Sequence, residues 1–254
     1  MATAAPVILG VFAHPDDESL ACGGCLARAA ALGARVVLVS LTRGEAGPND
    51  GDAAALGARR AGEFSAAART LGAEAAVALD HADGMLPWLD PAAIDRDIRA
   101  LIATHRPDVV ITFDADGLYW HPDHITVHER VTAVVTALGQ AAPALFYVSL
   151  PPGQMRAVAA RAGGADVVPG LHDADAFGAA ALPPTLVIDA GPLAARKLAA
   201  IRCHASQFVG SAFAALTAEE AALIAREHYR RADVGAAGLT LLDRIGTPPA
   251  AASA

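Results

Sequence analysis

The amino-acid sequence predicts an α/β fold: a Rossmann-like, three-layer α/β/α architecture with a mostly parallel sheet and a C-terminal elaboration. Apolar strand-like runs alternate with helix-like segments over roughly the first 150 residues, an order typical of βαβ units around a parallel sheet. Gly33, Gly72 and Gly139 stand where helices are expected to end, because glycine is favoured just past a helix terminus. The length of 254 residues fits one large domain.

The elements of the core follow one another in a regular alternation. The strand-like runs cover residues 7–13, 35–41, 75–79, 108–113 and 145–150. The helix-like segments cover residues 18–32, 54–71, 91–105 and 123–138. Right-handed crossovers between parallel strands place the carboxyl ends of these strands along one edge of the sheet. Side chains that are distant in the sequence are therefore expected to meet at that edge.

The pattern loosens in the C-terminal part of the chain. Residues 151–183 are rich in Gly, Ala, Pro and Asp, and they predict a short helix and loops over the main sheet. A strand is expected at 185–189 and a helix at 192–204. A capping-box pattern at 217–220 predicts a further helix that runs to about residue 231.

These elements predict one domain rather than two. It spans residues 1–245, with a core at about 1–150 and a C-terminal elaboration at about 151–245. Residues 246–254 are rich in Ala, Pro and Ser, and we expect them to form a disordered tail.

Composition and charge exclude several classes of partner. The formal net charge is −8 and Lys and Arg form no cluster, so neither nucleic acid nor an anionic membrane is an expected partner. No stretch approaches the roughly 18–20 uninterrupted apolar residues that a membrane span needs. Residues 1–6 lack the basic region of a signal peptide, and we therefore expect a soluble, cytoplasmic protein.

The three cysteines, an odd number, do not predict a disulfide framework. Cys22 and Cys25 form a C-x-x-C pattern, which also occurs in redox and zinc sites. The pattern lies within an expected helix, with Gly23 and Gly24 between the thiols and no second pair in the sequence. We interpret both cysteines as small residues that pack the helix.

The segment Ala13-His14-Pro15-Asp16-Asp17-Glu18 directly follows the first strand-like run and is hard to explain as structure. Charged side chains crowded together repel one another unless a cation or a proton lies among them. Ligands of open α/β sheets bind outside the carboxyl ends of strands. The segment therefore predicts half of a metal site.

The segment His121-Pro122-Asp123-His124 supplies the second half, after the strand-like run at 109–113. Two histidines at i and i+3 share one face of a helix. Together the two segments offer imidazole and carboxylate ligands that suit Zn, Fe or Mn. Each segment alone is also explained by a solvated helix N-terminus, where acidic residues are favoured; their occurrence together favours the metal site.

These motifs resemble the PIG-L/LmbE-like family of zinc-dependent deacetylases that act on N-acetylglucosaminyl compounds. The resemblance covers most of the chain, and the two metal motifs in this order are its most specific part. The supporting residues are Ser19-Leu20, Gly23-Gly24, Thr42-Arg43-Gly44-Glu45-Ala46-Gly47, Arg60, Glu63, Leu71-Gly72, Asp83-Gly84-Met85, Lys197 and His204-Ala205-Ser206-Gln207.

The resemblance implies that His14, Asp17 and His124 bind Zn²⁺, with Fe²⁺ as an alternative and water in the open position. Three protein ligands and one open position are the arrangement of catalytic zinc sites. The resemblance also implies that Asp16 is the general base and that His121, as an imidazolium, stabilises the tetrahedral oxyanion. A simple helix-cap role is the alternative for Asp16.

The resemblance also implies roles for three residues around the second motif. Asp123 is implied to orient or charge a histidine, with a helix-cap role as the alternative. Tyr119 is implied to hydrogen-bond the reacting amide oxygen, or else to form an aromatic rim of the pocket. Trp120 departs from the family pattern, which commonly has glycine there; an indole narrows the pocket or stacks on a sugar face.

Other motif residues are candidates for substrate binding by resemblance. Arg60 and Asp83 match positions that hold sugar hydroxyls or a polar aglycone. Arg60 is alternatively expected to pair with Glu63 on the same helix. His204 and Gln207 are interpreted as packing residues of the C-terminal part.

The function we expect is a metal-dependent hydrolase that removes an acetyl group from a small amino-sugar substrate of the N-acetylglucosaminyl type. A metal-dependent amidase or esterase for another small N-acyl compound is the main alternative. A non-haem Fe(II) oxygenase shares the ligand types, but its cupin members are built on jelly rolls. A nucleotide-binding module needs G-x-G-x-x-G, and acidic residues stand in that turn. The sequence leaves open the sugar, the aglycone and whether the protein is a homo-oligomer.

Overall fold

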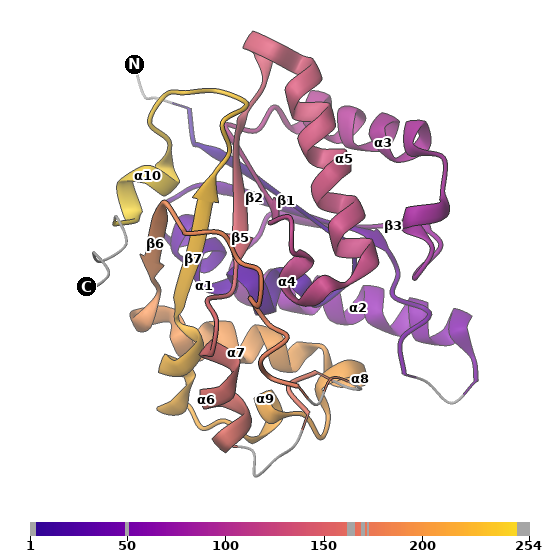
Figure 1. The fold of residues 1–254 in the computed structure, drawn as a ribbon, viewed down its shortest axis with the longest axis vertical. Helices are drawn as coiled ribbons and strands as arrows, with labels where there is room; N and C mark the ends of the chain where they lie inside the picture. The colour runs from indigo at the N-terminus through magenta and orange to yellow at the C-terminus, as the bar shows by residue number, and fades with distance from the viewer. Residues whose placement is uncertain (1–3, 49–50, 162–165, 169–170, 172, 248–254) are drawn as a thin grey trace.

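The computed structural model describes all residues except 1–3, 49–50, 162–165, 169–170, 172 and 248–254. The described residues form a mixed sheet of seven strands in the order β3-β2-β1-β4-β5-β7-β6 (Figure 1). The strands are β1 (Val7–Phe12), β2 (Arg35–Thr42), β3 (Ala75–His81), β4 (Val109–Phe113), β5 (Ala144–Ser149), β6 (Leu186–Asp189) and β7 (Arg226–Arg231). β7 is antiparallel to both of its neighbours, whereas β1 to β5 pair in parallel. The predicted fold class is confirmed.

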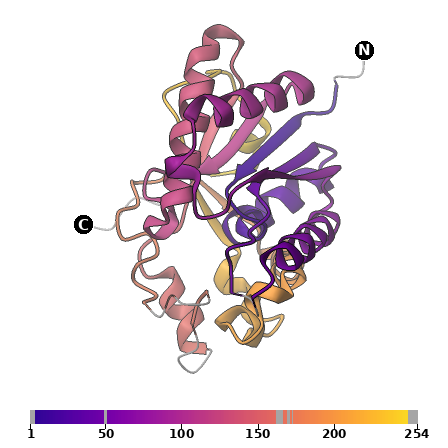
Figure 2. The ribbon, with the colours of Figure 1, turned by 90° about the vertical axis from the view of Figure 1, so that its right-hand side faces the viewer.

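Helices cover both faces of this sheet, as the alternating pattern predicts. The α-helices are α1 (Asp17–Ala31), α2 (Ala53–Leu71), α3 (Pro91–His105), α4 (Gly117–Trp120), α5 (Pro122–Leu138), α6 (Gln154–Arg161), α7 (Ala194–Cys203), α8 (Ala205–Phe208), α9 (Ala212–Ala215) and α10 (Leu241–Ile245). The 3₁₀ helices are η1 (Leu86–Trp88), η2 (Gly139–Ala141), η3 (Gly191–Leu193) and η4 (Glu220–Ile224). α3 packs with α5 on one face, and α1 packs with α2 and α7 on the other (Figure 2).

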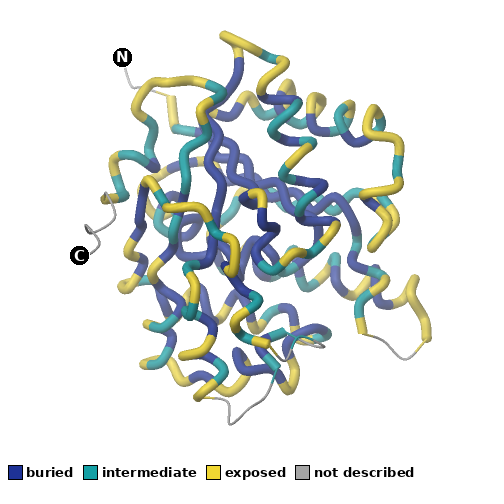
Figure 3. The backbone as a smooth tube through the Cα atoms, viewed as in Figure 1, coloured by how far each residue is buried: buried dark blue, intermediate teal, exposed yellow. Residues whose placement is uncertain are grey.

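The central strands are buried along their whole length, as Figure 3 shows by their dark blue colour. Strands that are covered on both faces are expected to be apolar throughout rather than alternating. Gly10 of β1 pairs with Leu38 of β2 on one side and with Ile111 of β4 on the other. The rings of Phe12 and Phe113, at the ends of β1 and β4, meet edge to face with 5.3 Å between their centroids.

The strand order reverses between β1 and β4, and this reversal opens a crevice at the carboxyl edge of the sheet. From β1 the chain moves outward to β2 and β3, then returns to place β4 against the other side of β1. The loops after β1 and β4 therefore leave the sheet in opposite directions. Crevices of this kind are where open α/β sheets bind ligands, and the two predicted metal motifs follow these two strands.

The helix predicted from 217 to about 231 is wrong. The capping-box hydrogen bonds between Thr217 and Glu220 are present, but the helical segment is the five-residue η4. Residues 226–231 instead form β7, which pairs with β5 and β6. A capping box fixes the first turn and says nothing about later residues. In β7, Glu227 and Tyr229 are buried and alternate with less buried neighbours, which is the period of a strand.

The strand and the other helices expected in the C-terminal part are confirmed. The predicted strand and helix correspond to β6 and α7, and α6 is the short helix expected within 151–183. The predicted tail falls mainly on 248–254, outside the described residues, while Thr247 pairs with Val187 of β6. Among the helices that the structure describes, none combines the length and apolar character needed to cross a membrane. The thiols of Cys22 and Cys25 are buried within α1 and form no disulfide.

Candidate active site

The loop between β1 and α1 holds Asp16 in a strained conformation. Asp16 has a φ of 133°, a region that non-glycine residues rarely adopt and that costs on the order of 1–3 kcal/mol. Its backbone N–H donates to Glu18 Oε2 at 3.1 Å. Asp17 Oδ2 accepts the backbone N–H of His14 at 2.8 Å. Asp16 makes no side-chain capping bond to α1, so the alternative helix-cap role is not what the structure shows.

The loop between β4 and α5 is strained as well. Leu118 and Trp120 have φ values of 68° and 65° in the short turn α4. His121 Nδ1 accepts the backbone N–H of Asp123 at 3.2 Å and so caps α5, where Pro122 occupies the first turn. The left-handed backbone at Trp120 gives a physical reason for the glycine that family members commonly carry there, because glycine adopts this conformation without strain.

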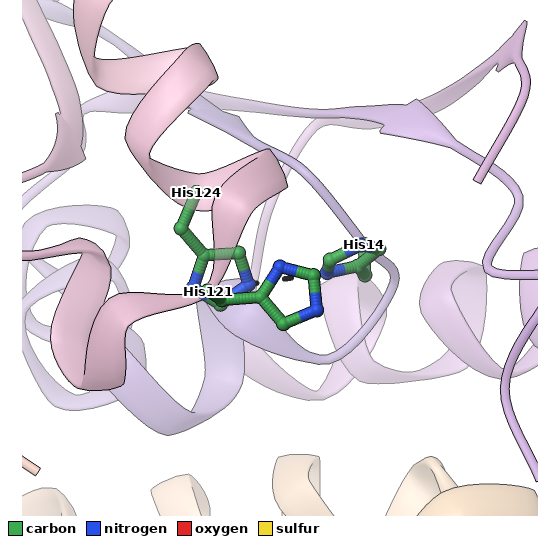
Figure 4. Close-up of side chains that lie close together, drawn as sticks. All are labelled: His14, His121 and His124. Carbon is green, nitrogen blue, oxygen red and sulfur yellow. Dashed lines mark hydrogen bonds between the residues drawn. The ribbon is translucent and has the colours of Figure 1, made fainter. Parts of the chain in front are cut away.

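Three ligand-type side chains converge between these loops. His14 Nδ1 lies 3.1 Å from His124 Nε2 and 3.5 Å from Asp17 Oδ2, and His124 Nε2 lies 3.2 Å from Asp17 Oδ1 (Figure 4 shows the histidines). A tetrahedral site with zinc bonds of about 2.0–2.1 Å has edges of about 3.3 Å. The spacing of the three side chains therefore fits a zinc-sized ion between them.

In each of these two histidines the outer ring nitrogen, which points away from the other ligands, already has a hydrogen-bond partner. His124 Nδ1 lies 3.1 Å from the carbonyl oxygen of Gly117. His14 Nε2 lies 3.0 Å from Asp83 Oδ1 and 3.3 Å from Asp123 Oδ2. A proton on each outer nitrogen leaves a lone pair on each inner nitrogen, and two lone pairs facing at 3.1 Å need a cation between them. The donor set thus fits a metal ion on its own chemistry.

Two other groups of residues are close enough to share a metal, but each includes a side chain that accepts a backbone hydrogen bond from the loops around the site. One contains His121 with His14 and His124, and the other contains Asp83 and Asp123 with His14. His121 Nδ1 accepts the N–H of Asp123. Asp123 accepts the N–H groups of Gly84 and Leu86, and Asp83 accepts that of Ala46. We therefore favour His14, Asp17 and His124 as the ligand set.

The charges around the ligand residues favour a cation at this site. Burial alone lowers the pKa of His14, but hydrogen bonds to Asp123, Asp17 and Asp83 outweigh it and raise the pKa well above 6.5. Burial alone raises the pKa of Asp17, but the charges of and hydrogen bonds to His124 and His14 outweigh it and lower the pKa well below 3.8. The surroundings therefore favour positive charge at His14, which a proton supplies in the metal-free protein.

Asp16 faces the pocket with its carboxylate tied to Arg60. Arg60 Nη2 donates to Asp16 Oδ2 at 3.0 Å and to the carbonyl of Pro15 at 2.8 Å, and Nη1 donates to the carbonyl of Gly44. Burial raises the pKa of Asp16 to about 6, against the lowering effect of Arg60. Arg60 does not pair with Glu63, which instead accepts two hydrogen bonds from Ser206.

His121 and Tyr119 line the same pocket. Burial, with the charges of His124 and His14, lowers the pKa of His121 to about 4. The imidazolium expected from the resemblance is therefore not favoured; the capping bond to Nδ1 leaves the proton of the neutral ring on Nε2. Burial raises the pKa of Tyr119 well above 10, so its hydroxyl keeps its proton.

The pocket that these residues line has a volume of about 470 Å³, within the range of small-molecule sites. Asp16, Asp17, Asp83 and Arg60 make its walls polar. Trp120 is 56% exposed and is not among the described residues that line the pocket.

Sequence reasoning missed two features of this site. Gln207 lines the pocket, although it was expected only to pack the C-terminal part. Glu18 and His204 form a buried pair behind Asp16. A buried carboxylate needs a partner, and this requirement together with the His204 motif was the available signal.

The fold and this site define a Rossmann-like α/β protein with a candidate metal centre at the switch point of its sheet. The family model for PIG-L, described as GlcNAc-PI de-N-acetylase, matches residues 9–135. A relative from Nakamurella multipartita, 1D-myo-inositol 2-acetamido-2-deoxy-alpha-D-glucopyranoside deacetylase, is 36% identical over 270 residues that cover 88% of each chain. The chain belongs to the PIG-L family.

Solved structures share the fold at lower sequence identity. N,N'-diacetylchitobiose deacetylase from Pyrococcus horikoshii has a TM-score of 0.62 and 22% identity, and the match covers 80% of this chain and 71% of that one. GalB, the 4-carboxy-2-hydroxymuconate hydratase of Pseudomonas putida, has a TM-score of 0.63 and 17% identity, with 92% and 99% covered. The fold thus occurs with different chemistries, so function must be argued from the site and the family.

Proposed function

We propose that this protein is a metal-dependent deacetylase that hydrolyses the acetamido group of a small N-acetylglucosaminyl compound. The observation that carries the proposal is the convergence of His14 Nδ1, His124 Nε2 and the Asp17 carboxylate within 3.1–3.5 Å, at the pocket that Asp16 and His121 line. The PIG-L relationship supplies the substrate class. Zinc as the bound metal and a cytoplasmic location belong to the same proposal.

His14, Asp17 and His124 would hold the metal. When bound, it supplies a Lewis acid that polarises the acetamide carbonyl and acidifies water at the open position. Asp123 and Asp83 orient His14 by accepting from its Nε2. Carboxylates that fix a ligating histidine in this way also increase its basicity.

Asp16 accepts the proton of the attacking water and returns it to the amine nitrogen as the C–N bond of the tetrahedral intermediate breaks. Its pKa of about 6 makes it mostly ionised at neutral pH yet basic enough to take a proton. Arg60 holds one carboxylate oxygen at 3.0 Å, which fixes the rotamer and leaves the other oxygen for the water. Arg60 thus acts through Asp16, and a direct contact with the sugar is not needed for this role.

His121 and Tyr119 stabilise the oxyanion that forms on the acetamide oxygen. The neutral His121 ring presents an Nε2–H, and the protonated Tyr119 presents an O–H. Donors that are positioned before the reaction gain strength as negative charge develops. Asp83 and Trp120 remain our candidates for contacts with the sugar or aglycone.

A deacetylation screen tests the proposal. The purified protein, loaded with Zn²⁺ or Fe²⁺, is incubated with N-acetylglucosamine, N,N'-diacetylchitobiose and N-acetylglucosaminyl-inositol, and released amine is measured. We expect metal-dependent amine release from at least one of them. Release of amine from unrelated N-acyl compounds alone would favour the amidase alternative, and activity that requires O₂ would favour an oxygenase.

His121→Ala is expected to retain the metal and to lower kcat by about 10²-fold, because one oxyanion donor is removed. Metal content by atomic emission and kcat on the best substrate measure the two effects. His128→Gln, about two turns further along α5, is the matched control and is expected to leave kcat unchanged. Wild-type turnover in His121→Ala would refute the oxyanion role.

The pH profile of kcat is expected to report Asp16. A general base works when deprotonated, so activity falls as pH decreases through its pKa. A bound cation lowers the pKa of a nearby carboxyl group, so this acidic limb of the profile is expected at or below about pH 6. Arg60→Met removes the charge that lowers this pKa, so the acidic limb moves upward by about one pH unit or more. Arg59→Met, an exposed neighbour on α2, is the control. An unchanged limb in Arg60→Met contradicts the assignment.

A further inference from the structure

A buried ion pair lies directly behind Asp16, and its histidine comes from the C-terminal part of the chain. His204 Nε2 lies 2.9 Å from Glu18 Oε1, and both side chains have an exposed fraction of 0%. Glu18 Oε1 also accepts the hydroxyl of Ser19 at 2.5 Å, whereas Oε2 accepts the backbone N–H of Asp16 at 3.1 Å. One carboxylate thus joins His204 to the backbone of the residue with the strained φ of 133°.

The same segment also braces the helix that carries Arg60. The N–H and the hydroxyl of Ser206 donate to Glu63 on α2 at 2.9 and 2.6 Å. Arg60 lies one turn earlier on α2 and holds the Asp16 carboxylate. Residues 204–206 therefore contact both elements that hold Asp16: Glu18, which binds its backbone N–H, and α2, whose Arg60 binds its carboxylate.

We propose that His204 is a positioning residue for the general base: through Glu18 it fixes the backbone of Asp16 and so directs its carboxylate into the pocket. The inference rests on the proposed function, because it takes Asp16 as the base. Of the described residues lining the pocket, this segment contributes Gln207 and Phe208 but not His204, so His204 acts through Glu18 rather than on substrate. A strained backbone persists where its surroundings over-determine it.

The test compares two neutral amides at position 204. In His204→Gln the amide nitrogen takes the place of Nε2 and still donates to Glu18. In His204→Asn it takes the place of Nδ1, which has no hydrogen-bond partner among the described residues. We expect His204→Gln to keep kcat within about threefold of wild type and His204→Asn to lose about tenfold or more, because small displacements of a catalytic group are costly. KM and metal content stay unchanged in both variants.

Arg231→Ala is the control for general loosening of the C-terminal part. It removes hydrogen bonds to Asp243 and to the carbonyls of Ala236 and Gly238, and we expect a lower Tm with wild-type kcat. Glu18→Gln is the second variant, and it tests the proposal by itself if His204→Asn does not fold. Its single oxygen cannot replace both carboxylate oxygens, so kcat is expected to fall by a similar factor.

Equal kcat in His204→Gln and His204→Asn overturns the proposal, as does wild-type kcat in Glu18→Gln. Crystal structures of the variants give a readout that does not depend on turnover: the φ of Asp16 is expected near 133° in His204→Gln and displaced in His204→Asn or Glu18→Gln. An inactive wild-type protein refutes the proposed function alone, since the φ comparison still decides the positioning role.

Discussion

Asp16→Asn is expected to lose nearly all deacetylase activity while it keeps the bound metal. The loss in kcat is expected to reach about 10²–10⁴-fold, the usual contribution of a general base. The asparagine has the same shape, and its oxygen still accepts from Arg60 Nη2, which now lies 3.0 Å from Asp16 Oδ2. The proton acceptor is therefore removed with little change to the loop. Kcat and metal content, measured on the same preparation, check both halves of the prediction.

The control for this variant is Asp80→Asn, which neutralises an exposed carboxylate paired with Arg43 outside the pocket. It is expected to keep wild-type kcat. If Asp16→Asn loses metal to the same extent as a ligand variant, Asp16 belongs to the ligand set and the general base must be sought elsewhere. Retained activity with retained metal would contradict the role of Asp16 directly.

The fold and the proximity of the two motifs were predictable because their signals are local. Each central strand is an apolar run, and each metal motif stands at the end of such a run. The rule that parallel strands end at one edge then brings His14 and His124 together across 110 positions. The roles of these residues stay predictions until metal binding is measured.

The support of Asp16 was not predictable in the same way. The contact of His204 with Glu18 joins residues 186 positions apart, and no periodicity connects them. We expected Arg60 to bind substrate or to pair with Glu63, because Glu63 is a near neighbour on the same helix. In the structure Arg60 pairs with Asp16, which is distant in the sequence, and no sequence pattern connects the two. The incorrect prediction of a helix at 217–231 has a related cause. β7 forms because β5 and β6 pair with it, and these partners are distant in the sequence.

The protonation state of His121 depends on contacts that only the structure shows. The family resemblance implies an imidazolium at His121 and a carboxylate at Asp123 that orients or charges a histidine. In the structure, Asp123 Oδ2 contacts His14 instead, while His121 accepts the N–H of Asp123. Burial, together with the charges of His124 and His14, lowers the pKa of His121 to about 4. The result is a neutral donor suited to an oxyanion next to a cationic site.

His14→Ala is expected to abolish metal binding, with an affinity loss of roughly 10³-fold or more, since even outer-shell partners are worth about 10–100-fold. Wild-type protein is expected to gain about 4 kcal/mol in unfolding free energy with free zinc at about 1,000 times Kd. His14→Ala shows no such gain, whereas His121→Ala keeps it. Loss of the gain in His121→Ala would instead identify the three histidines as the ligand set.

The zinc-induced gain in stability is also expected to grow as pH rises. The pKa of His14 is raised in the folded metal-free protein, so its protonated form contributes stability below about 6.5, and this contribution is lost as pH rises through the raised pKa. At low pH the metal must displace that proton, and at higher pH it meets a vacant lone pair. Thermal unfolding with and without zinc at pH 6 and pH 8 measures the difference. A gain that is larger at pH 6 would show that His14 is not a ligand.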